Sequence, residues 1–204
     1  MPRSPFKISS LVVLALLACS AIQPDPTSLS NREHGDAARP EPGVHGPNAV
    51  EWVEAHFLSQ QSGLGAHEIR LASETIVEQS AKHDVPLDLM LAVIHLESGF
   101  HNFARSRVGA LGLMQIMPGT GEALARELDI GWNGPATLFQ PVDNVRMGTH
   151  YLRFLHTRYG SWDLALAAYN WGPAAIDRRL RRGHGLPALY ISQVYSRLQS
   201  PDAL

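Results

Sequence analysis

The 204-residue sequence has a single cysteine and almost no net charge, because 17 Lys and Arg residues stand against 19 Asp and Glu residues. A charge of −2 at pH 7 gives no indication of a nucleic-acid partner, since proteins of that class carry a basic surface. The sequence also lacks an internal repeat and any convincing strand pattern of alternating polar and apolar residues. Its hydrophobic fraction of 45% and its four tryptophans are ample for the core of one domain.

A metal centre is not expected either. The sequence has ten histidines, but the motif His-Glu-x-x-His is absent. His95 and His101 are six residues apart, as are His150 and His156, and this is not the spacing of zinc ligands. We interpret these histidines as surface or cleft-edge residues, and we predict no metal and no cofactor.

Residues 1–18 have the composition of a signal peptide. Arg3 and Lys7 supply positive charge, and residues 11–18 form an apolar segment that is too short to span a bilayer comfortably. Residues 19–48 then shift to Pro, Gly, Asp, Ser and Asn without apolar periodicity, which predicts a disordered linker. The folded domain is therefore expected over residues 49–204.

Cys19 ends the segment Leu-Leu-Ala-Cys, which resembles a bacterial lipobox. This resemblance implies that the cysteine is lipidated and becomes the mature N-terminus, and that Ser20 after it favours the outer membrane. Several acyl chains on one residue would give stable anchoring. The alternative is ordinary cleavage after Ser20, at a small-x-small site.

Apolar residues at three- and four-residue spacing predict helices along most of the folded domain. The expected segments are a short one around residues 50–57, then 67–81, 86–97, a short one after residue 120, 145–159, 163–170 and 188–198. The predicted fold class is all-α, with a short irregular hairpin around residues 105–113.

Glu97 is the residue that points most directly to chemistry. Leu87, Met90, Leu91 and Ile94 repeat at helical spacing, and Glu97 is the next position on this apolar stripe. A carboxylate on the core face of a helix is costly unless it is paired or protonated with a raised pKa. Such groups occur mainly where acid–base chemistry takes place, so Glu97 is a candidate general acid. The alternative is a carboxylate that caps a turn or pairs with a nearby arginine.

Three short motifs extend this interpretation. Residues 97–100 read Glu-Ser-Gly-Phe, residues 112–116 read Gly-Leu-Met-Gln-Ile, and residues 168–172 read Ala-Tyr-Asn-Trp-Gly. In this order, they closely resemble the soluble lytic transglycosylase family of the lysozyme-like superfamily, and the resemblance covers roughly residues 66–198. It implies an all-α, goose-type lysozyme-like catalytic domain.

The resemblance also implies a periplasmic enzyme that acts on peptidoglycan glycan strands. In this family a protonated Glu, here Glu97, donates its proton to the bond between N-acetylmuramic acid and N-acetylglucosamine, and then removes one from the muramyl C6 hydroxyl. The product is a 1,6-anhydro end, and no water is consumed. Two alternatives stay open: a muramidase that uses water on the same fold, and a non-catalytic peptidoglycan-binding accessory of an envelope-spanning apparatus. We expect a monomer.

The same resemblance assigns supporting roles to five residues. Ser106 would orient the substrate or the catalytic Glu, Met114 would line the cleft, and Gln115 would hydrogen-bond the sugar. Tyr169 would point its hydroxyl toward the carboxylate or the N-acetyl group, and Asn170 would bind substrate or close the turn before Gly172. The alternatives from the residues alone are a loop serine, a core methionine, an exposed amide and a core tyrosine.

A second carboxylate would be needed by most glycosidases. The motif segments contribute none, so Asp163 and Glu122 are the first candidates, although Asp163 is more simply a helix cap.

Residues 178–182 form a run of four arginines around Leu180. We interpret this run as a solvated helix end, and contact with anionic peptide stems or lipid head groups is the alternative. The sequence departs from many relatives in lacking their Pro-x-Glu-Thr stretch before the last helix.

Overall fold

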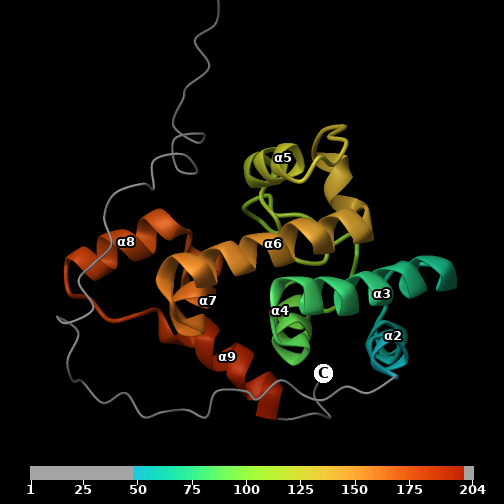
Figure 1. Cartoon of the computed structure of the whole chain (residues 1–204), viewed down its shortest axis with the longest axis horizontal. Helices are drawn as coiled ribbons and strands as arrows, with labels where there is room; N and C mark the ends of the chain where they lie inside the picture. Colours follow the sequence, from blue (N-terminus) through green and yellow to red (C-terminus); the bar gives the residue numbers. More distant parts are fainter. Residues whose placement is uncertain (1–47, 200–204) are drawn as a thin grey trace, which may run out of the picture. The chain divides into compact units, whose positions relative to one another are not determined.

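The structure is a computed structural model that describes residues 48–199. The predicted signal peptide, Cys19 and the predicted linker except for Asn48 lie outside these residues. The described part consists of helices without a β-strand, which confirms the all-α prediction (Figure 1). Its elements are α2 (Ala49–Ser59), α3 (Ala66–His83), α4 (Leu87–Ser98), α5 (Pro118–Glu127), the 3-10 helix η1 (Pro135–Phe139), α6 (Pro141–Tyr159), α7 (Trp162–Trp171), α8 (Pro173–Arg181) and α9 (Ala188–Gln199). None of the helices described is both long and apolar enough to cross a membrane.

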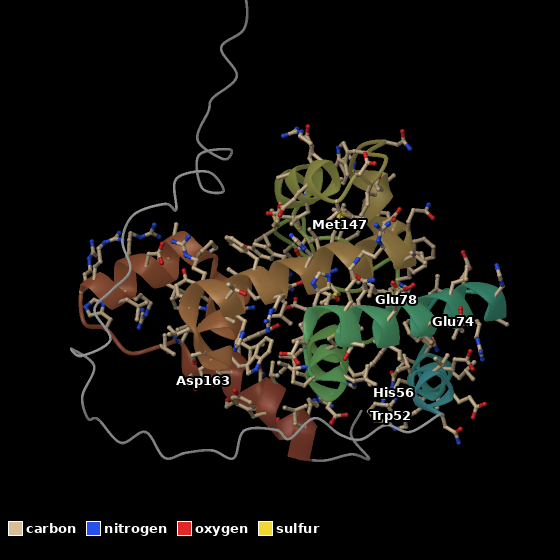
Figure 2. The ribbon with its side chains drawn as sticks, viewed as in Figure 1. Trp52, His56, Glu74, Glu78, Met147 and Asp163 are labelled. Atoms are coloured by element: carbon tan, nitrogen blue, oxygen red, sulfur yellow. The ribbon has the colours of Figure 1, made fainter. Side chains whose placement is uncertain are left out.

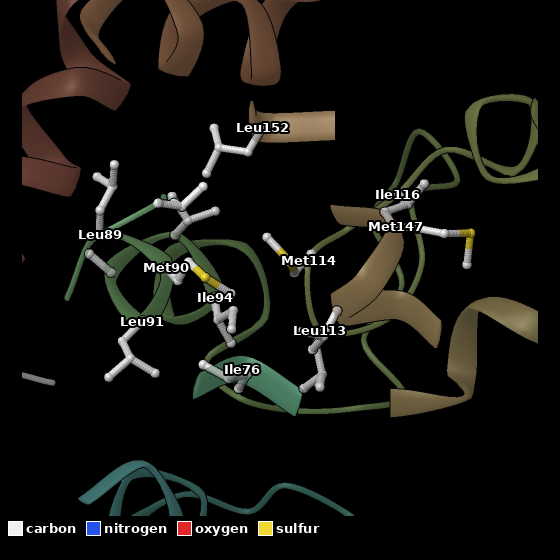
Figure 3. Close-up of a cluster of buried hydrophobic side chains, with 14 of the residues drawn as sticks. Ile76, Leu89, Met90, Leu91, Ile94, Leu113, Met114, Ile116, Met147 and Leu152 are labelled. Carbon is white, nitrogen blue, oxygen red and sulfur yellow. The ribbon is translucent and has the colours of Figure 1, made fainter. Parts of the chain in front are cut away.

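Helix α4 is the centre of the hydrophobic core. It begins after Pro86, whose φ of −53° suits a helix start, and it ends at Gly99, which takes the left-handed conformation at φ +57°. The predicted stripe is buried, but Leu89 and Val93 on other faces are also fully buried. Figure 3 shows Leu89, Met90, Leu91 and Ile94 pointing in several directions from this helix. Core therefore surrounds α4, and the expectation of a single buried stripe was too narrow.

Helix α6 connects the parts of the fold that carry the predicted motifs. It runs beside α3, and α7 packs against it (Figure 1). Gly148 within α6 gives the side chain of Met114 its space, since a Cβ at this position would overlap the Met114 sulfur. Helix α9 packs against both α4 and α7, so the C-terminal helix closes over the helix that carries Glu97.

The predicted hairpin is present between α4 and α5. Two isolated antiparallel bridges, Arg105 with Leu111 and Leu111 with Ile116, make a compact, irregular double turn. Gly112 is required inside it, because its φ is +80° and an added Cβ would overlap the Leu138 carbonyl and the Asn144 amide.

Some element boundaries differ from the predictions. Helix α5 begins at Pro118 rather than after Thr120, since proline is well tolerated in the first turn. The arginine run lies at a helix end, as interpreted, but this end belongs to a separate helix, α8, that was not predicted and that starts at Pro173 directly after Gly172. The 3-10 helix η1 was not predicted, because a five-residue segment shows no periodicity.

Candidate active site

Glu97 lies in the last turn of α4, where its carboxyl group is largely buried. Burial is the main cause that raises the pKa of Glu97 above its ordinary value. The negative end of the α4 dipole also disfavours the charged carboxylate, so it raises the pKa of Glu97 as well. A carboxyl group held in this way retains its proton to a higher pH than an exposed one, as a general acid requires.

Tyr190 is the hydrogen-bond partner of Glu97. Its hydroxyl donates to Glu97 Oε1 over 2.6 Å, and this bond partly offsets the effect of burial on the pKa of Glu97. Tyr190 lies in the first turn of α9, 93 residues away in the sequence, and its side chain is 8% exposed. The sequence interpretation did not assign it a role. The feature of the sequence that could have pointed to Tyr190 is its place in the first turn of the last predicted helix.

The turn after Glu97 is held in place by aromatic packing. Gly99 and Phe100 both have positive φ, at +57° and +61°. A left-handed conformation costs roughly 1–2 kcal/mol for a non-glycine residue. The fully buried Phe100 ring packs against Phe57 of α2 and His95 of α4, at 5.1 and 6.1 Å between ring centroids. This packing keeps the chain in the strained turn and fixes where α4 ends.

Ser106 and Gln115 stabilise the hairpin that follows. Ser106 Oγ accepts a hydrogen bond from the Ala110 N–H over 2.9 Å. The Gln115 side chain donates from Nε2 to the carbonyls of Gly112 (2.8 Å) and Ala104 (3.1 Å), and Gln115 itself has a φ of +48°. Both predicted binding residues thus have well-defined structural roles in the loop.

Met114 and Tyr169 lie in direct contact, but not as the motif predicted. The Met114 side chain is fully buried among Met90, Ile94 and Leu113, and this burial favours the core alternative over a place in the cleft wall (Figure 3). The Tyr169 hydroxyl donates to the Met114 carbonyl over 2.7 Å rather than to the carboxylate.

A group of tyrosines nevertheless surrounds Glu97. The pKa values of Tyr169 and Tyr190 are both raised well above the ordinary value of a tyrosine. Burial is the main cause, and the charge of Glu97 is the second. Tyr151 of α6 lies beside Tyr169, with 5.7 Å between the ring centroids. Protonated phenols and apolar surfaces therefore form the environment of the Glu97 carboxyl group.

The family model of the transglycosylase SLT domain matches residues 74–188, which is more than half of the chain. The chain belongs to this family. The match begins inside α3 and ends where α9 starts. Tyr190 therefore lies just beyond the matched part of the SLT domain, in the region where the sequence departs from the Pro-x-Glu-Thr pattern.

Curated relatives are larger proteins. The soluble lytic murein transglycosylase of Escherichia coli K12 is 36% identical over 104 residues, which is 50% of this chain and 16% of that protein. A transglycosylase of Enterobacteria phage PRD1 is 35% identical over 99 residues, 48% of this chain and 34% of the phage protein. The SLT domain described here thus spans only a small part of the length of these relatives.

Solved structures share the fold of this SLT domain. An inactive Glu-to-Gln mutant of the lytic transglycosylase Slt from Pseudomonas aeruginosa aligns with a TM-score of 0.55 and 30% identity, over 64% of this chain and 24% of that one. The 70-kDa soluble lytic transglycosylase of Escherichia coli aligns with a TM-score of 0.53 over 76% of this chain and 27% of that one, and its 24% identity supports the fold alone.

The candidates for a second carboxylate in the SLT domain are engaged elsewhere. Asp163, in the first turn of α7, is exposed and accepts a hydrogen bond from the Tyr195 hydroxyl over 2.6 Å (Figure 2). Glu122 of α5 is 55% exposed and lies 3.6 Å from Arg126. Neither residue is among the causes that shift the pKa of Glu97. Within residues 48–199, the site therefore has one perturbed carboxyl group next to tyrosine hydroxyls.

Asn170 and the histidines are the remaining residues that the sequence analysis discussed. Asn170 is exposed at the C-terminal end of α7, one residue after Tyr169. His101 Nδ1 contacts the Gln61 carbonyl, and His150 contacts Glu127, each over 2.9 Å. In the described part of the chain, no group of three or more His, Cys, Asp or Glu side chains is placed to hold a metal ion.

Proposed function

We propose that this protein is a lytic transglycosylase that cleaves the β-1,4 bond between N-acetylmuramic acid and N-acetylglucosamine in peptidoglycan without water. The observation that carries the proposal is Glu97, whose buried carboxyl group has a raised pKa and a tyrosine hydrogen bond at 2.6 Å, with no contribution from a second carboxylate. Retaining and inverting glycosidases need two carboxylates. A site with one requires that the substrate supply the nucleophile.

The proposed reaction uses Glu97 twice. As the acid, it transfers its proton to the glycosidic oxygen, and the bond from the muramyl C1 to this oxygen breaks. As the base, the resulting carboxylate removes the proton of the muramyl C6 hydroxyl, whose oxygen forms the new bond to C1. The proton count of Glu97 is restored, and the product is a 1,6-anhydro ring. The muramyl N-acetyl group stabilises the cationic centre between these steps. The names of the relatives and the inactive Glu-to-Gln mutant from Pseudomonas aeruginosa support this proposal.

The supporting residues are proposed to act around this carboxyl group. Gln115 donates both of its described bonds from Nε2, so its Oε1 is proposed to accept a hydrogen bond from a sugar hydroxyl. Asn170 is exposed and is proposed to contact the glycan. Ser106 and Tyr169 are proposed to act indirectly, because Ser106 closes the hairpin and Tyr169 holds the Met114 carbonyl.

The decisive experiment is product analysis. The full protein is incubated with purified sacculi, and the released muropeptides are examined by mass spectrometry. Muramyl ends that are one water lighter than the hydrolysis product are expected. Full-weight reducing ends would show a water nucleophile and therefore a muramidase. Binding without release of fragments would indicate the accessory role.

Replacing Tyr190 with phenylalanine is expected to shift the pH–rate profile. The lost hydrogen bond stabilises the carboxylate, so the pKa of Glu97 should rise further and the alkaline limb of kcat/KM should move to higher pH. We expect kcat to fall about tenfold, because the carboxyl group loses its orienting donor. Tyr195→Phe is the matched control, since Tyr195 of the same helix donates an equally short bond to Asp163. A profile that moves equally in both variants would contradict the role of Tyr190.

We also propose that the protein works in the periplasm and is anchored to the outer membrane through lipid on Cys19. The lipobox-like segment that ends at Cys19 supports this anchor. Cys19→Ser is expected to move the protein from the detergent-extracted membrane fraction to the soluble periplasmic fraction. An unchanged distribution would contradict the anchor.

A further inference from the structure

A small basic cavity lies at the junction of α7 and α8, apart from the residues that contact Glu97. Its volume is about 170 Å³. Pockets for drug-sized ligands measure roughly 300–1,000 Å³, so this one suits a single small group. It is lined by Trp171, Ala175, Arg178, Arg179, Arg182 and His184.

The α8 sequence explains why the cations gather here. Ala175, Arg178, Arg179 and Arg182 follow one another at spacings of three, one and three residues, which places them on one face of α8 and its C-terminal cap. Ala175 leaves room between the longer side chains. Figure 2 shows nitrogen-tipped side chains along α8. The helix dipole accounts for cations at a C-terminus, but it does not account for a cavity that they line together.

The cations of this face are not neutralised by the acids around them. Asp177 is the acid of α8, and it accepts hydrogen bonds from Arg158 (2.8 Å) and the Tyr159 hydroxyl (2.7 Å) of α6. Among residues 48–199, no carboxylate lies within ion-pair distance of Arg178 or Arg182. Both side chains are exposed. The cavity therefore offers positive charge to an external anion.

One wall of the cavity is preorganised. Arg179 donates from Nε and Nη2 to the Gly185 carbonyl, over 2.9 and 2.7 Å. Its guanidinium lies 5.3 Å from the centroid of Trp171, whose side chain remains 50% exposed. The two bonds to Gly185 hold the Arg179 guanidinium, and the half-exposed Trp171 ring lies against it in the lining that also contains Arg178 and Arg182.

The cavity also shares its supporting elements with the candidate active site. Trp171 follows Tyr169 by two residues in α7, and Gly185 lies in the segment that leads into Tyr190 and α9. A polymer bound near Glu97 would therefore have its side groups close to the same two elements.

We infer that this cavity binds a free carboxylate of a peptide stem on the glycan strand. This inference rests on the proposed function, because it takes the stem-bearing polymer as the substrate. Arginine guanidinium groups bind carboxylates through charge-assisted hydrogen bonds, and the Trp171 ring covers the apolar part of the peptide. The cavity makes the enzyme favour strands that carry stems over strands that lack them.

The test compares two substrates and two double variants that add negative charge to α8. Retention is measured with intact sacculi and with glycan strands that an amidase has freed of their stems and that are then fixed to beads, using the full chain in a Glu97→Gln background so that the polymer is not degraded. The double variant Arg178→Glu/Arg182→Glu alters the cavity. The double variant Ala174→Glu/Arg181→Glu is the control for added negative charge on α8, because both positions are exposed and neither lines the cavity.

We expect the cavity variant to bind intact sacculi about tenfold more weakly, since charge-assisted bonds to the stem are lost. Its retention on stem-free strands should equal that of the parent, and the control variant should bind like the parent on both substrates. Equal weakening on both substrates, or in both variants, would overturn the inference. So would unchanged retention on sacculi combined with lost binding to phosphatidylglycerol vesicles, which would assign the cavity to a lipid surface.

The proposed function has an independent readout. Stem-free strands are digested with the cavity variant that retains Glu97, and the masses of the products are determined by mass spectrometry. Anhydro ends there would support the transglycosylase whether or not the stem preference is found. Hydrolytic ends would reject the transglycosylase, while the pulldown would still decide whether the cavity recognises stems.

Discussion

Glu97→Gln is expected to reduce the release of anhydro-muropeptides from sacculi by about 10³-fold or more, because the amide can neither donate nor accept the proton in the two proposed steps. The fold should persist, since Gln has nearly the same shape and its Oε1 can still accept the Tyr190 hydroxyl over the observed 2.6 Å. Glu122→Gln and Asp163→Asn are the matched controls, and both should retain activity. Activity that survives in Glu97→Gln but is lost in a control would move the catalytic role to that control position.

The same variant has an expected dependence of stability on pH. The pKa of Glu97 is raised by folding above the ordinary value of 4.5, so the folded chain binds this proton more tightly than the unfolded chain. The resulting stabilisation is fully present below that value and is lost as the pH rises through the folded pKa. The melting temperature of the parent minus that of Glu97→Gln should therefore decrease from pH 4 to pH 8. A difference that increases with pH would contradict the burial effect.

Asn144→Ala is expected to cause the largest loss of stability, about 3–5 kcal/mol in the free energy of unfolding. Asn144 is fully buried in α6. Its Oδ1 accepts the Met114 N–H (2.8 Å), and its Nδ2 donates to the carbonyls of Leu138 (2.8 Å) and Leu111 (3.1 Å). The substitution removes three bonds that join α6 to the hairpin and to η1, and it leaves the Met114 N–H without this partner.

Asn102→Ala is the matched control for this prediction. Asn102 is 1% exposed and makes one side-chain bond, from Nδ2 to the Phe139 carbonyl over 2.8 Å. The same atoms are deleted, but one bond is lost instead of three, so a loss of about 1 kcal/mol is expected. In thermal denaturation, each kcal/mol lowers the melting temperature by roughly 2–4 °C for a domain of this size. Equal losses in the two variants would show that Asn144 does not link the three segments.

Local patterns predicted the elements that depend on local causes. The apolar spacing around Met90 and Ile94 predicts α4, and Gly99 and Gly172 mark the ends of α4 and α7, because each of these signals acts within a few residues. The start of α8 had a usable signal as well. Pro173 follows a glycine, and proline is favoured at the first helical position.

Long-range contacts explain what local patterns could not predict. A buried polar group takes the nearest partner that the fold provides, and for the Tyr169 hydroxyl this is the Met114 carbonyl, 55 residues away in the sequence. A methionine in a motif has the same apolar character in a core as in a cleft, so only the packing of Met114 over Gly148 distinguishes the two. No local pattern in the sequence indicates the linking role of Asn144, because its bonds reach positions 30 and 33 residues away.

The sequence by itself determined the helical class, the order of the three motifs and Glu97 as the candidate acid, since a carboxylate that continues an apolar stripe can be recognised within one helix. The tertiary structure decided which groups surround that acid. It brought Tyr190 to the carboxyl group from 93 residues away, placed Met114 in the core and left Asp163 and Glu122 with other partners. The physical reason is that the pKa and orientation of Glu97 depend on burial and on hydrogen bonds within a few ångströms, and these distances exist only after the helices have packed.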